Sequence, residues 1–391
     1  MSTALDQFTP EEVGERLRVA RESAKITQAA AANAMQAART TLVAIEQGQR
    51  RIRLEELQRL AGLYGTSVNA LLRREAVHVD LKPRFRKTDR DSDVDAATET
   101  LTRLVQAEIE LENLLGVQRR RSDPPERPLM PGDVSVQAEQ DAFELRQWLG
   151  LGLAPIHDIV SLLELQLGAH VFIRKLPPKI SGLYVYVDES GACILLNASH
   201  PRDRRAQTAA HELAHFISTR RAPDALYEGS SEASREERYA NAFARAFLTP
   251  ARSVMSKFQD VTAGASQLTR RHVIILAHAF GVSREAMVRR LEELKLTRPG
   301  TWDWFSQNNG ITDEQARQVL GSAAIDLVRT DATEPLPLRL GAMVSEAWRR
   351  ELLSEGQIAR LLGLDRTDVR ELVDTWDDDG GEANASLRLP A

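Results

Sequence analysis

The sequence predicts a multidomain, mostly α-helical protein that carries one small β-sheet near its centre. Its 391 residues exceed what a single hydrophobic core usually organises. Helical apolar spacing dominates both ends of the chain, while two short β-rich runs, 182–187 and 192–196, flank a turn at 188–191. We therefore expect an amino-terminal five-helix domain, a central α+β domain and a helical carboxyl-terminal region.

These patterns divide the chain into five segments. A proline-containing break at 119–132 separates a charged, helix-containing stretch from the central domain, and the acidic, glycine-rich end predicts a disordered tail. The expected segments are a helical domain at 8–75, a helical linker at 76–135, the α+β domain at 136–297, a helical domain at 298–376 and the tail at 377–391.

Composition limits the classes of function. The formal net charge of −5 argues against a generally basic coat for nucleic acid, so any contact with DNA should be local. No leading apolar segment resembles a signal peptide and no run of about 18 apolar residues occurs, which predicts a cytoplasmic protein without a membrane partner. The one cysteine, Cys193, lies in an apolar strand and is expected to be a buried structural thiol.

Five short helices are expected in the amino-terminal domain. Thr27 can cap the second helix, and Gly48 can end the third as its C′ residue. A turn of about four residues joins these two helices, which is the geometry of a helix-turn-helix DNA-binding motif. The expected helices span residues 11–23, 27–33, 39–47, 54–64 and 67–72.

This domain resembles the XRE (Cro-type) helix-turn-helix repressors along its whole length. The matching stretches are 17–21, 27–28, 45–48, 57–61 and 63–67. The resemblance implies binding to double-stranded DNA, with Gln28 on the DNA backbone and Arg39, Thr40 and Ala44 facing the major groove. It also implies a structural ion pair between Arg21 and Glu46.

Local charge agrees with contact to phosphate. Residues 39–53 carry four arginines against one acid, a net charge of +3, and Arg50 and Arg51 are therefore further DNA-binding candidates. The alanine-rich stretches 29–32 and 37–38 offer few polar side chains for base contacts, so sequence discrimination should be modest. A protein-docking module is the alternative. A homodimer is also compatible, because repressor-like domains commonly pair.

The strongest chemical signal is the HExxH pattern at 211–215. His211 and His215 are four residues apart on an expected helix, so both imidazoles can reach one zinc ion. Glu212 between them is placed to act as general base toward a metal-bound water.

A third ligand has to come from elsewhere in the chain. The segment 234–250 reads as a helix with an apolar stripe, and Glu237 faces the same side as that stripe, one turn before Asn241. We therefore expect Glu237 as the third zinc ligand and Asn241 as a hydrogen-bond partner of a metal-binding histidine.

These two motifs together resemble the ImmA/IrrE family of zinc metallopeptidases. In that family HExxH is followed by a Glu-x-x-Ala-Asn-x-Phe-Ala helix, which is matched here from Glu237 to Ala244, although the helix ends in Leu-Thr-Pro and not in Leu-Met-Pro. The resemblance covers residues 155–297. It implies a bacterial, zincin-like enzyme that binds Zn²⁺ and cleaves or controls a repressor-type partner.

Other roles stay open at the level of sequence. A donor for a developing oxyanion is expected among Tyr239, Tyr184 and His200. The pair of expected helices at 353–363 and 366–373 fits packing and DNA binding equally well. A rival hypothesis is a transcription factor whose peptidase-like domain senses a ligand or partner without cutting it, and a third is a protease whose first domain docks a protein.

Overall fold

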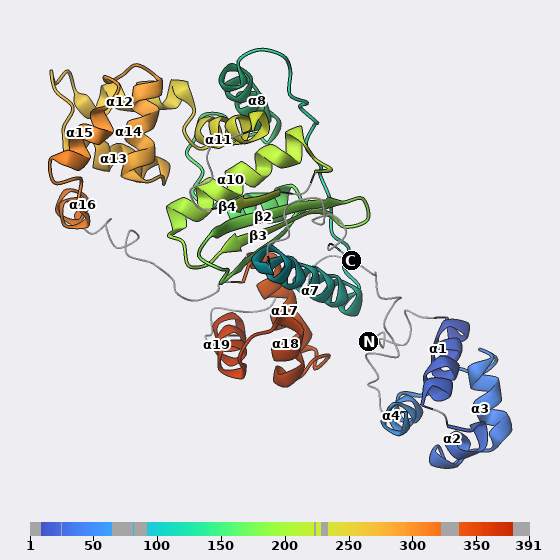
Figure 1. Cartoon of the computed structure of the whole chain (residues 1–391). Coiled ribbons are helices and arrows are strands. Elements are labelled where there is room, and N and C mark those ends of the chain that lie inside the picture. Colours follow the sequence, from blue (N-terminus) through green and yellow to red (C-terminus); the bar gives the residue numbers. More distant parts are fainter. Residues whose placement is uncertain are drawn as a thin grey trace. The chain divides into compact units, whose positions relative to one another are not determined.

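The computed structural model describes residues 9–24, 26–64, 81, 92–222, 224–227, 234–321 and 336–377. These residues are mostly helical, with a single small sheet in the middle of the chain, which confirms the predicted fold class (Figure 1). They divide into two compact units, and the amino-terminal helices and the sheet belong to different ones. No helix in the described ranges is long and apolar enough to cross a membrane.

Four helices of the amino-terminal domain are described, and the fifth expected helix, at 67–72, lies outside the described residues. Thr9 and Glu12 form a capping box at the first helix, and Thr27 caps the second by accepting from the amide of Ala30. Gly48 adopts a φ of 72° just after the third helix, as expected for a C′ residue. The helices are α1 (Pro10–Ser23), α2 (Gln28–Ala34), α3 (Arg39–Glu46) and α4 (Leu54–Leu63).

A long helix, α7 (Ser92–Leu115), lies within the stretch 76–135 that was expected to be a helical linker. Apolar side chains that recur at helical spacing along it are buried, among them Leu101, Leu104 and Leu111. The residues that follow, from 119 onward, are bonded to the segment just before the first strand of the sheet: the amide of Ser122 donates to the carbonyl of Leu167.

The sheet of the central domain has the strand order β1-β3-β2-β4. The predicted hairpin is confirmed: β2 (Ile180–Val187) runs antiparallel to β3 (Gly191–Asn197), with Tyr184 opposite Ile194. Two strands were not expected. β1 (His170–Arg174) pairs parallel with β3, and β4 (Asp224–Tyr227) pairs antiparallel with β2 at the edge.

Three helices stack on this sheet in successive layers (Figure 1). Helix α10 (Arg202–Ser218) packs on β2 and β3, α11 (Arg235–Leu248) packs on α10, and α8 (Val134–Trp148) packs on α11. Residues 159–166 form a short helical stretch before β1, α9 (Ile159–Ser161) followed by the π-turn η2 (Leu162–Gln166). The main hydrophobic core fills these layers, so α10 is buried on both sides.

The remaining helices lie downstream of α11. Two of them, α13 (Arg270–Phe280) and α14 (Arg284–Glu293), are joined through Gly281 in a left-handed conformation. The pair expected near 353–373 is confirmed as α18 (Glu355–Leu362) and α19 (Arg366–Asp377), and the tail beyond residue 377 lies outside the described residues. The others are α12 (Ala251–Thr262), α15 (Thr301–Gln307), α16 (Asp313–Leu320) and α17 (Leu338–Arg349).

Candidate metal centre and DNA-binding face

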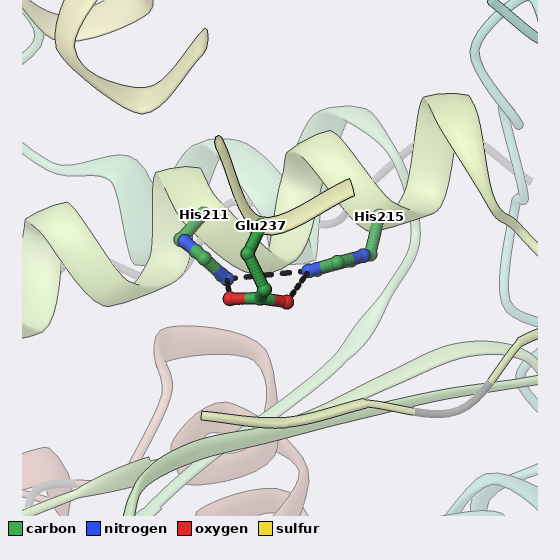
Figure 2. A group of neighbouring side chains, drawn as sticks. All are labelled: His211, His215 and Glu237. Atoms are coloured by element: carbon green, nitrogen blue, oxygen red, sulfur yellow. Dashed lines mark hydrogen bonds and ion pairs between the residues drawn. The ribbon is translucent and has the colours of Figure 1, made fainter. Parts of the chain in front are cut away.

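Helices α10 and α11 bring together the three side chains that the sequence assigns to zinc. His211 and His215 project from the same face of α10, and Glu237 reaches them from the first turn of α11 (Figure 2). Ser234 caps α11 by accepting from the amide of Glu237 at 3.0 Å, which fixes the backbone of this residue. His211, His215 and Glu237 form the one metal-competent group of His, Cys, Asp and Glu side chains found in the described part of the chain.

The distances between the three donors fit a zinc ion. The two Nε2 atoms are 3.2 Å apart, and each lies 3.5 Å from an oxygen of Glu237. Ligands bonded to a tetrahedral zinc at about 2.0–2.2 Å lie roughly 3.3–3.6 Å from each other. Two imidazole nitrogens in such close contact need a proton or a cation between them. The residues present therefore fit a zinc ion held by two neutral histidines and one carboxylate.

Electrostatics also favour a charged carboxylate at Glu237. Burial raises the pKa of this carboxyl, but hydrogen bonds from His211 and His215, and their positive charge whenever the rings are protonated, outweigh burial, and the pKa lies well below its ordinary value. An anionic oxygen beside two imidazoles is the donor chemistry that zinc sites use.

Glu212 lies inside the same helix and is completely buried. Its carboxylate lies against strand β2: a Cβ atom added to Gly182 would be 2.9 Å from Oε1 of Glu212 and 2.6 Å from Cγ2 of Thr208. Gly182 belongs to a strand, so close approach of the helix, and not an unusual φ, explains its lack of a side chain. The strand and helix therefore confine the carboxylate of Glu212.

Each histidine has a second hydrogen-bond partner behind it. Nδ1 of His211 lies 3.0 Å from Oδ1 of Asn241, and Nδ1 of His215 lies 3.1 Å from the hydroxyl of Thr219. An Nδ1 proton donated to Asn241 leaves Nε2 of His211 with a lone pair for a metal. Thr219 is not predicted from the sequence, although its position one helical turn after His215 is a usable signal.

The three expected oxyanion donors lie in different surroundings. The buried hydroxyl of Tyr239 donates to Asp141 on α8 at 2.8 Å, and burial with this acid raises the pKa of Tyr239 strongly. The hydroxyl of Tyr184 donates to the carbonyl of Arg220, and its ring lies 6.5 Å from that of His215. His200 is buried just before α10. Of the three, Tyr184 is the one with a ring contact to a metal-centre histidine.

The amino-terminal domain contains the ion pair that its sequence implies. Arg21 bonds Glu46 through two nitrogens, at 2.6 and 3.1 Å, and both side chains are buried. Gln28, expected on the DNA backbone, donates to Glu46 at 3.0 Å and accepts from Arg39 at 3.3 Å. A continuous series of hydrogen bonds thus connects the buried Glu46, through Gln28, to Arg39 at the start of α3.

The other DNA-binding candidates lie on or just after α3. Thr40 and Arg51 are exposed and Ala44 is half-buried. Arg50 forms an ion pair with Glu56 at 2.9 Å, inside the domain. Their contacts with DNA stay predictions, but α3 presents the exposed amino-terminal face that recognition helices use.

The carboxyl-terminal pair α18–α19 has the same connectivity as α2–α3 but a different charge. A three-residue turn with Gly363 at φ 66° joins its helices. Residues 366–377 carry two arginines and four acids, a net charge of −2, whereas residues 39–53 carry +3. Phosphate contact is therefore better supported for the amino-terminal pair.

The fold and the sites together define a DNA-binding regulator with a peptidase-like domain. Comparison with family models agrees: residues 12–74 match a helix-turn-helix domain, and residues 165–292 match the IrrE N-terminal-like domain, which is a peptidase family. The fused arrangement expected from the sequence is thereby confirmed. Comparison with curated proteins and with solved structures gives no match.

Proposed function

We propose that this protein is a zinc metallopeptidase-type regulator that cleaves or controls a repressor-type protein while its amino-terminal domain binds double-stranded DNA. The observation that supports this most is the convergence of His211, His215 and Glu237, with donor separations of 3.2–3.5 Å beside the buried Glu212. Neither a helix cap nor core packing requires two imidazoles and a carboxylate at such spacing.

The chain's own residues supply most of the proposed mechanism. His211, His215 and Glu237 would hold zinc, and Asn241 and Thr219 would fix the orientation of the two imidazole rings. A bound zinc ion lowers the pKa of water toward neutrality and polarises a peptide carbonyl. Glu212 would accept the proton of the attacking water and deliver it to the leaving amine.

One observation favours a second candidate function. Glu212 is fully buried, and the side chains of His211 and Glu237 are 1% and 21% exposed. Solvent therefore reaches the centre mainly at the side chain of Glu237. A metal held in such an enclosed centre also suits a regulator that senses a ligand or partner without cutting it.

Metal content tests the centre itself. We expect about one zinc per chain in the wild type and near zero in His211→Ala and Glu237→Gln, because each removes one of three protein ligands. Glu236→Gln is the matched control, because Glu236 is the exposed neighbour of Glu237 on the same helix. Equal zinc in all four proteins would reject the site.

Cleavage distinguishes the two candidates. The protein is co-expressed with repressors encoded by neighbouring genes, and fragments are compared between the wild type, Glu212→Gln and the Glu236→Gln control. The peptidase hypothesis predicts that Glu212→Gln keeps its zinc and slows cleavage by about 10²–10⁴-fold, the usual contribution of a general base. Intact repressors with every protein, alongside stoichiometric zinc, would favour the non-proteolytic sensor.

A further inference from the structure

The proline-rich segment 124–132 runs past the ends of both helices of the metal centre. It contains Pro124, Pro125, Pro128 and Pro131 and forms no helix or strand. Four prolines fix φ and remove four amide donors, so the segment is stiff and offers mainly carbonyl groups for bonding. We call residues 124–132 the brace.

The brace is anchored on α8 and α10 through its backbone. The side chain of Gln137 on α8 donates to the carbonyl of Pro128 and accepts from the amide of Met130, each at 2.9 Å. The amide of Arg127 donates to the carbonyl of Ile217, near the end of α10, at 2.6 Å. These bonds give the brace a fixed path along the domain.

An arginine at the end of α10 binds the first part of the brace. Arg220 donates to the carbonyl of Pro124 and forms an ion pair with Glu126 at 3.1 Å. Its side chain is 12% exposed and packs over the rings of Phe216 and Tyr186. Arg220 directly follows Thr219, the hydrogen-bond partner of His215.

A second arginine, at the start of α11, binds the last part of the brace. Arg235 donates to the carbonyls of Met130 and Gly132, the latter at 2.9 Å. Arg235 lies two residues before Glu237, in the same first helical turn. The ends of α10 and α11 that carry His215 and Glu237 are thus bonded to one stiff segment.

We propose that Arg220 and Arg235 are positioning residues that, through the brace, set the separation between His215 and Glu237 and thereby the zinc affinity of the centre. This inference rests on the proposed function, because it concerns the same metal centre. Metal ligands have to be held within about 0.5 Å of the productive geometry, and a shared stiff support does this for ligands on two different helices.

The test measures Zn²⁺ affinity of the full-length protein by competition with a chromogenic chelator. We expect Arg220→Ala and Arg235→Ala each to weaken Zn²⁺ binding about tenfold, at the lower end of the loss seen when outer partners of a metal site are removed. The controls are Arg202→Ala and Arg245→Ala. Arg202 lies at the opposite end of α10 and donates to the carbonyl of His157. Arg245 lies in the last turn of α11 and pairs with Glu293.

A double variant tests whether both arginines act through one segment. Loss of either arginine removes one of the two arginine links between the brace and the helix ends that carry His215 and Glu237. The coupling is then already broken in each single variant, so Arg220→Ala/Arg235→Ala should bind Zn²⁺ only slightly more weakly than the single variant with the lower affinity. Losses that multiply would overturn the shared brace. If an alanine variant does not fold, as judged by circular dichroism, Arg220→Lys and Arg235→Lys replace it, and a smaller loss of affinity is expected.

The remaining outcomes separate this inference from the proposed function. A wild-type protein that holds no Zn²⁺ would overturn both. A wild-type protein that binds Zn²⁺, with unchanged affinity in the folded arginine variants, would overturn the brace alone. Equal weakening in the Arg202→Ala and Arg245→Ala controls would also overturn it, because the effect would then be general destabilisation.

Discussion

The metal centre and the DNA-binding face differ in how far their functional side chains are already assembled. At the centre, three donors from two helices meet at 3.2–3.5 Å, and the rings are fixed from behind. The candidate DNA-binding face consists of Gln28, Arg39, Thr40, Ala44, Arg50 and Arg51. There Gln28 and Arg39 are bonded to each other, and Gln28 also bonds Glu46. A metal ion can enter the first arrangement as it stands, whereas DNA has to exchange hydrogen bonds in the second.

This difference shows where specificity should arise. Metal binding to a preorganised centre costs little free energy for ordering its side chains. Selection of a protein partner therefore has to come from the surfaces around the centre. A DNA-binding face with internal bonds must give some of them up, and its sequence discrimination should depend on which exchanges succeed.

The largest effect is expected from a substitution in the buried ion pair of the amino-terminal domain. Glu46→Ala removes the buried carboxylate that pairs with Arg21 and leaves this guanidinium only the exposed Glu22 and the carbonyl of Ile26. We therefore expect a loss of about 3–5 kcal/mol in the stability of that domain. Hydrogen exchange of the full-length protein measures it as faster exchange in α1 and α3. Glu15→Ala, which removes an exposed acid on α1 that pairs with Arg18, is the control and should change exchange little. Unchanged exchange in Glu46→Ala would contradict a structural role for the pair.

A substitution in β2, behind α10, tests how tightly the candidate metal centre is preorganised. Gly182→Ala places a Cβ within 2.9 Å of Glu212 and 2.6 Å of Thr208, so we expect a cost of about 1–3 kcal/mol in thermal unfolding. Adding Thr208→Ser removes the methyl group and should restore part of the stability, while the contact with Glu212 remains. A Gly182→Ala protein as stable as the wild type would show that α10 can move away from the sheet.

Removing a support behind His211 should have an effect of similar or smaller size. We expect Asn241→Ala to weaken Zn²⁺ binding about 10–100-fold, because the ring of His211 loses its fixed orientation. Chelator competition measures this loss. Arg238→Ala, an exposed position on the same helix, serves as the control. Equal affinity in Asn241→Ala and the wild type would show that packing alone orients the ring.

The smallest effects are expected on the DNA-binding face. Arg39→Ala and Arg51→Ala should each weaken binding to duplex DNA several-fold and lower the slope of log affinity against log salt by about one. A titration at two salt concentrations measures both. Arg370→Ala, on the acidic α19, is the comparison and should leave the affinity unchanged. Unaltered affinity in Arg39→Ala and Arg51→Ala would favour a protein-docking role for this domain.

Local sequence patterns predicted the parts of the molecule that depend on neighbours along the chain. The i, i+4 spacing placed His211 and His215 on one face, the cap Thr27 placed α2, the apolar stripe placed α11, and the turn at 188–191 placed the hairpin. The apolar stripe of α11 also predicted that Glu237 approaches the two histidines. The stripe faces the core, and Glu237 lies on the same side of the helix as the stripe.

Features that depend on distant pairing were missed. β1 pairs parallel with β3, which lies more than twenty residues later in the sequence. No local pattern in His170–Arg174 indicates which strand it pairs with. The role of Gly182 depends on the packing of a strand against α10, and the partner of Tyr239 is Asp141, nearly a hundred residues away. These contacts are set by the layering of sheet, α10, α11 and α8.

The central claim is that two imidazoles and one carboxylate of this chain hold a zinc ion. X-ray absorption at the zinc edge of the full-length protein tests it most directly, with Glu237→Gln as the comparison. The account predicts nitrogen and oxygen ligands at about 2.0–2.2 Å, with the scattering pattern of two imidazoles, and loss of the metal in the variant. Sulfur at about 2.3 Å, a single imidazole, or an unchanged spectrum in Glu237→Gln would contradict it.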